Sequence, residues 1–67
     1  MDRKIVAFEY AKAATIALHM ARTESDLVNW WNEEKQNRDL LDMSPDTSPG
    51  LELYQALKSY RNELRKT

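Results

Sequence analysis

Side chains that could do chemistry are few in this chain. His19 is its one histidine and cysteine is absent, so a lone imidazole would need an orienting partner to act as a general base, and a zinc site lacks ligands. Glu33 and Glu34 are adjacent and point in different directions on a helix. No glycine-rich phosphate loop is present. We therefore expect no catalytic residue, no cofactor site and no metal site, and a protein that acts by binding.

The most unusual group of residues is a tryptophan pair followed by an ion-pair spacing. Trp30 and Trp31 precede Glu34 and Arg38, which are four residues apart and can pair on one helix face. Trp and Arg are enriched in interface hot spots. Because adjacent side chains diverge by about 100° on a helix, we expect one tryptophan in the core and the other at an interface.

We interpret Trp30, Trp31, Glu34 and Arg38 as a protein-binding surface. The partner is either a second copy or a foreign protein. On this interpretation, charge reversal at Arg38 abolishes partner capture and leaves helicity intact. In the alternative interpretation, the Glu34–Arg38 pair bridges a partly exposed groove while the tryptophans fill the core.

A basic stripe runs along the last helical segment. Lys58, Arg61 and Arg65 are spaced i, i+3, i+7, which is compatible with phosphate contacts or with a solvated face. The preceding connection, residues 44–50, exceeds the three or four residues of a helix-turn-helix turn. A DNA-binding regulator using these residues is thus an alternative function.

Charge is distributed unevenly, although the net charge is only −1. Residues 1–22 carry four basic and two acidic groups, residues 23–46 two basic and seven acidic, and residues 47–67 four basic and two acidic. An acidic surface of the middle segment could meet a basic partner. The simpler interpretation is that oppositely charged helices attract each other within the fold.

Good helix formers dominate the chain, and its one glycine and two prolines all lie between positions 45 and 50. We predict helices over residues 3–22, 24–43 and 49–65, in one domain. Asp2 and Thr23 are the expected N-caps of the first two, and Ser48 and Pro49 the N-cap and first residue of the third. Fusion of the first two helices is the alternative. The third carries an apolar stripe formed by Leu53, Leu57, Tyr60 and Leu64, flanked by Ala56.

The first predicted helix is apolar on two sides. One face is a seam that we expect to mediate self-association, and its members are Val6, Tyr10, Ala13, Ala17 and Met20. A second stripe on roughly the opposite side comprises Ile5, Phe8, Ile16 and His19, interrupted by Lys12. A chain of 67 residues buries too little surface for ample stability. The expected fold is therefore all-α, a three-helix antiparallel bundle or a helical hairpin, completed by homodimerisation.

No stretch is long and apolar enough to span a bilayer, and the N-terminus lacks the pattern of a signal peptide. We therefore expect a cytoplasmic protein without membrane contact.

The residues from position 30 to position 64 follow a recognisable order. It runs through Trp30-Trp31, residues 37–41 (NRDLL), a proline-containing gap, residues 53–57 (LYQAL), Arg61 and Leu64. This order resembles helical segments of small phage and prophage accessory proteins. The resemblance implies an accessory protein that modulates a host process by binding, and it assigns no functional residue. Three functions stay open: a protein-binding regulator or adaptor, a DNA-binding regulator, and a self-assembling structural subunit.

Overall fold

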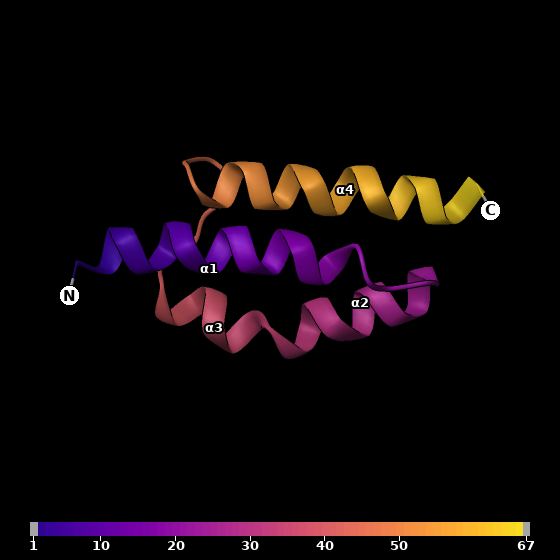
Figure 1. The fold of residues 1–67 in the computed structure, drawn as a ribbon, viewed down its shortest axis with the longest axis horizontal. Helices are drawn as coiled ribbons and strands as arrows, with labels where there is room; N and C mark the ends of the chain where they lie inside the picture. The colour runs from indigo at the N-terminus through magenta and orange to yellow at the C-terminus, as the bar shows by residue number, and fades with distance from the viewer. Residues whose placement is uncertain (1, 67) are drawn as a thin grey trace.

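The protein folds as three long helical segments packed side by side, each called a leg below. The leg that comes second along the chain is bent. The computed structural model describes residues 2–66, in which the helices are α1 (Arg3–Leu18), α2 (Glu24–Glu33), α3 (Lys35–Leu40) and α4 (Gly50–Lys66). In Figure 1, α1 lies between α4 and the α2–α3 leg, and α1 and α4 run in the same direction. The molecule measures 41 × 19 × 16 Å. The prediction of an all-helical fold is confirmed.

The predicted cap of α1 is confirmed, but the predicted end of that helix is wrong. The carboxylate of Asp2 accepts a hydrogen bond of 2.9 Å from the backbone N–H of Lys4. The helix ends at Leu18 and not at residue 22, because a turn closes over residues 19–21. The hydroxyl of Tyr60, on α4, donates to the carbonyl oxygen of Ala21 and holds this turn in place.

The predicted break before the second helix is confirmed at Thr23. The hydroxyl of Thr23 accepts a hydrogen bond of 3.1 Å from the backbone N–H of Asp26, which satisfies one of the unpaired donors at the start of α2. Helices one and two are therefore not fused.

The prediction of one helix over residues 24–43 is wrong, because Glu34 interrupts it and its last part ends at Leu40. Asp42 adopts a left-handed conformation with φ of 52°. The backbone N–H of Met43 donates to the Arg38 carbonyl, and that of Asp42 to the Asp39 carbonyl. This is a Schellman motif, with aspartate at the position that glycine usually occupies. The chain thus leaves the helix without a glycine or proline.

The connection between α3 and α4 passes directly over the start of α4. A Cβ atom placed on Gly50 would lie 2.0 Å from the carbonyl oxygen of Ser44, so only glycine permits this approach. The helix predicted to begin at Pro49 is α4, and it begins at Gly50, so the prediction of Pro49 as its first residue is wrong. The Ser48 hydroxyl donates a hydrogen bond to the Glu52 carboxylate in the first turn of α4.

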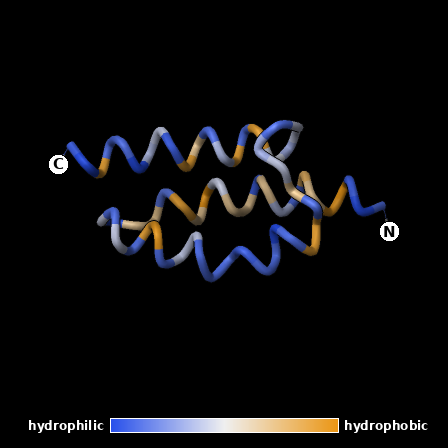
Figure 2. The backbone as a smooth tube through the Cα atoms, turned by 180° about the vertical axis from the view of Figure 1, so that it is seen from behind, coloured by the Kyte–Doolittle hydropathy of each residue, from blue (hydrophilic) through white to orange (hydrophobic). Residues whose placement is uncertain are grey.

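A small core joins the three legs. Its buried members are Ala11, Ala14, Leu18, Leu27 and Leu53. The predicted stripe of α4 is confirmed, since Ala56, Leu57, Tyr60 and Leu64 pack against this core. The inward face of α1 consists of Ala7, Ala11, Ala14 and Leu18, and its small side chains let the other legs approach closely. Figure 2 shows α1 apolar over most of its length, while α3 is hydrophilic.

Candidate protein-binding surface

Arg38 lies inside the fold rather than on a binding surface. The residue is only 5% exposed, and its guanidinium carbon lies 3.7 Å from the centroid of the Trp31 ring. Its Nη1 donates a hydrogen bond of 2.6 Å to the carbonyl oxygen of Trp31, one of the last carbonyls of α2 that helix geometry leaves unpaired. The predicted protein-binding role thus conflicts with the burial of Arg38, whose position explains how the bend between α2 and α3 is held.

Glu34 does not form the predicted pair with Arg38. Its carboxylate accepts hydrogen bonds from the Tyr10 hydroxyl, at 2.7 Å, and from the Asn37 side-chain amide, at 3.3 Å. Burial, together with this hydrogen bond to Glu34 and the charge of Glu34, raises the pKa of Tyr10 well above its ordinary value. The bond joins α1 to the bend of the α2–α3 leg and keeps the phenol protonated.

The two tryptophans have different surroundings. Trp31 packs edge-on against Tyr54, with ring centroids 5.0 Å apart and an interplanar angle of 86°, and Arg38 covers its face. Trp30 packs against the core along one side and lines a surface hollow along another. Both tryptophans are half-buried and pack against the core, so the predicted division between a core tryptophan and an interface tryptophan stays a prediction.

The hollow beside Trp30 lies between the end of α1 and the start of α2. Its volume is about 360 Å³, and its lining comprises Ala17, Met20, Ala21, Asp26 and Trp30. Met20 is 76% exposed. Sequence reasoning missed Ala21 and Asp26 as members of this surface. The signal for Asp26 was its position in the first turn after the Thr23 cap, which brings it next to the end of α1.

The predicted self-association seam is only partly accessible. Ala13 and Met20 are exposed, whereas Val6, Tyr10 and Ala17 are half-buried. Tyr10 is engaged with Glu34, and Ala17 lines the hollow with Met20. The structure thus brings the C-terminal part of the seam together with Trp30, whose ring lies beside that of Trp31, with centroids 6.2 Å apart.

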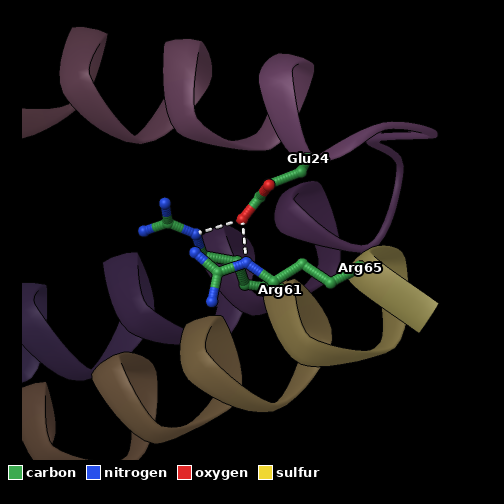
Figure 3. Close-up of polar contacts among 3 residues, drawn as sticks. All are labelled: Glu24, Arg61 and Arg65. Carbon is green, nitrogen blue, oxygen red and sulfur yellow. Dashed lines mark hydrogen bonds and ion pairs between the residues drawn. The ribbon is translucent and has the colours of Figure 1, made fainter.

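The predicted basic stripe on α4 is largely occupied within the molecule. Arg61 and Arg65 both bind the carboxylate of Glu24, at the start of α2, with an Arg61 Nε to Glu24 Oε2 distance of 2.7 Å (Figure 3). Hydrogen bonds from Arg61 and Arg65 lower the pKa of Glu24 below its ordinary value. Among residues 2–66, Lys58 is the member of the stripe that is exposed and forms no ion pair.

Most ion pairs of residues 2–66 join segments of opposite charge. Arg3 pairs with Asp42 across 2.6 Å, and Glu24 pairs with the two arginines of α4. Both contacts link the acidic middle segment to a basic flanking segment. The interpretation that charge asymmetry serves attraction within the fold therefore holds for these residues.

His19 lies at the end of α1 and packs on the ring of Tyr60, with centroids 4.8 Å apart. Its Nδ1 is 2.7 Å from the Thr15 carbonyl oxygen and must donate, because a carbonyl only accepts. These contacts give His19 a structural role at the turn.

Comparison with family models, with curated proteins and with solved structures finds no match for this chain. The resemblance to phage accessory proteins therefore stays a prediction. None of the helices in residues 2–66 has the length and apolar character needed to cross a membrane.

Proposed function

We propose that this protein is a small non-enzymatic adaptor or regulator, which binds a protein partner through the hollow beside Trp30 and also associates with itself. The observation that carries the proposal is the juxtaposition of half-buried Trp30 with exposed Met20 around an apolar hollow. Aromatic residues and methionine are enriched at the centres of protein interfaces. A rigid indole beside a flexible thioether suits an inserted apolar side chain.

The lining of the hollow also indicates the chemistry of the partner. Ala17 and Ala21 contribute only small side chains to its lining, and Asp26 contributes a carboxylate. Asp26 forms none of the ion pairs among residues 2–66. We therefore expect the partner to insert an apolar side chain and to carry a lysine or arginine nearby.

A displayed library of random peptides, selected on the immobilised protein, tests this proposal for a partner of any sequence. We expect enrichment of peptides with an apolar anchor followed or preceded by a basic residue. Trp30→Ala should weaken their binding by about 2 kcal/mol or more, roughly 30-fold in Kd, as for other interface tryptophans.

The matched control is Leu40→Ala, which removes an exposed apolar side chain on α3, outside the hollow. Circular dichroism should show that both variants fold. Peptides that bind Trp30→Ala as tightly as the wild type would exclude the hollow as the binding site, and so would a selection that enriches nothing.

A further inference from the structure

The outward face of α1 carries an exposed apolar stripe with two charges at its centre. Ile5, Glu9, Lys12 and Ile16 follow the spacing i, i+4, i+7, i+11 and so share one helix face. Each stands two residues before a member of the inward face, Ala7, Ala11, Ala14 or Leu18. Two residues correspond to a rotation of about 200°, so this outward stripe points away from the core.

The outward stripe is left uncovered by the rest of the molecule. Ile5 is 58% exposed and Ile16 is 67% exposed, and Phe8 lies at the edge of the stripe with 47% exposure. Glu9 and Lys12 are exposed, and neither takes part in an ion pair among residues 2–66. Large apolar side chains gathered on one surface mark an interaction site more often than single ones do.

The order of these four residues is self-complementary. Read in reverse, the stripe runs isoleucine, lysine, glutamate, isoleucine, with the same spacing. If two copies of α1 cross antiparallel at the level of residues 10 and 11, Ile5 meets Ile16 of the other copy and Glu9 meets Lys12 of the other copy. Two-fold symmetry repeats both contacts. A parallel arrangement would place glutamate against glutamate and lysine against lysine.

We infer that the occupant of the outward stripe is a second copy of this chain, bound antiparallel through Ile5, Glu9, Lys12 and Ile16. This inference rests on the self-association part of the proposed function and gives it a face and a register, distinct from the predicted seam. The contact spans only the central turns of one helix, about 16 Å along its axis. It falls short of the roughly 800 Å² per partner of a standard stable interface, so the dimer is weak and concentration-dependent.

The arrangement also sets where the binding hollows lie. The hollow beside Trp30 is at the C-terminal end of α1, whereas the two-fold axis passes near the middle of that helix. An antiparallel dimer therefore carries its two hollows at opposite ends, and it can engage two partner sites at once.

Sedimentation equilibrium over micromolar to low millimolar concentration tests the inference, with circular dichroism to confirm that each variant folds. We expect the wild type to dimerise reversibly. Lys12→Glu and Glu9→Lys should each raise the dimer Kd at least about tenfold, because each sets like charges against each other twice. Lys58→Glu is the matched control for Lys12→Glu, since it makes the same change of net charge at an exposed position of α4, and it should leave the Kd within about threefold.

The decisive arm is complementation between the two charge variants. An equimolar mixture of Lys12→Glu and Glu9→Lys restores both opposite-charge contacts in a heterodimer, and the double variant restores them in a homodimer. Recovery of the dimer mass in both cases supports the antiparallel register. A wild-type chain that stays monomeric would overturn self-association itself, whereas a dimer that ignores all these changes would overturn only the face. Neither result bears on peptide binding at Trp30.

Discussion

The side chain of Arg38 illustrates how one residue can hold a bend in a helical leg. Its guanidinium stacks on Trp31 and caps the Trp31 carbonyl, while its Nε has no hydrogen-bond partner among residues 2–66. A stacked, forked cation does this better than a lysine ammonium could, because the planar group covers the ring and reaches the carbonyl simultaneously.

Arg38→Glu should therefore unfold the protein instead of sparing its helicity. A carboxylate at this position would be buried without a cation and beside a carbonyl oxygen, which costs about 3 kcal/mol or more. Arg38→Met keeps the apolar stem and should cost about 1–2 kcal/mol, the value of the lost hydrogen bond and cation–π contact. Urea unfolding followed by circular dichroism measures both. Equal stability of the glutamate variant and the wild type would show that the guanidinium is not buried in solution.

Tyr10 gives the molecule a dependence on alkaline pH. Its pKa is raised in the folded state, mainly by burial and by Glu34, so the folded chain holds the phenolic proton more tightly than the unfolded chain does. The resulting stabilisation is complete below the ordinary pKa of 10.0 and is lost as the pH rises above it.

Tyr10→Phe tests this behaviour. At neutral pH the variant should lose about 1–2 kcal/mol of unfolding free energy, because Glu34 loses a hydrogen-bond donor. Above pH 10 the difference between wild type and variant should shrink, because Tyr10 ionises in the unfolded chain while the folded chain still holds its proton, so that alkaline pH favours unfolding of the wild type alone. Thermal unfolding at pH 7, 9 and 11 supplies the comparison, and a difference that stays constant with pH would contradict the assignment.

At the scale of the helices, the start of α4 depends on the absence of one side chain. Gly50→Ala would ordinarily strengthen a helix by up to about 1 kcal/mol. Here the added methyl group meets the Ser44 backbone, which cannot rotate away, and overpacking of this kind costs about 1–3 kcal/mol. We expect net destabilisation in chemical denaturation. Ser59→Ala, on an exposed position of the same helix, is the control and should be neutral or slightly stabilising.

Helix positions could be predicted from the sequence where local signals were strong. Asp2 and Thr23 cap helices by accepting hydrogen bonds from backbone N–H groups only two or three positions further along the chain. The apolar stripe beginning at Leu53 repeats with a clear helical period. The bend at Glu34 escaped prediction because it depends on Arg38 reaching back to Trp31. The end of α3 escaped it because aspartate takes the left-handed position usually held by glycine.

The inward face of α1 could not be predicted from periodicity. Ala7, Ala11 and Ala14 face the core, whereas the predicted seam passed through Ala13 and Ala17. Alanine and larger apolar residues occupy nearly every side of this helix, so no face stands out by composition. Three residues of the candidate site were singled out from the sequence, Trp30 for protein binding and Ala17 and Met20 for self-association, but their meeting depends on the turn at residues 19–23.

At the scale of the whole molecule, Glu24 joins the acidic middle segment of the chain to the basic last helix. Its pKa is lowered by Arg61 and Arg65, so its ionised form is favoured by folding. This stabilisation is present above the ordinary carboxyl pKa of 4.5 and is lost as the pH falls through the lowered value.

Glu24→Gln should lower the melting temperature at pH 7, and the deficit should vanish in acid below the lowered pKa of Glu24. Added salt should also reduce the deficit, because the contact is partly exposed and therefore screened. Glu63→Gln, on an exposed position of α4 without an ion pair, serves as the control. A deficit that is identical at pH 7 and in strong acid would argue against the ion-pair origin.

The parallel course of α1 and α4 (Figure 1) has a mechanical consequence. α1 begins at one end of the long axis, and α4 ends at the other. Tension applied between residues 2 and 66 is therefore directed along both helices and tends to slide them past each other. The side chains packed between them, such as Ala11, Ala14 and Leu53, all resist that sliding at the same time and do not separate one after another. A chain pulled in this direction is therefore loaded in shear, a geometry in which the helices must slide past each other before they can separate.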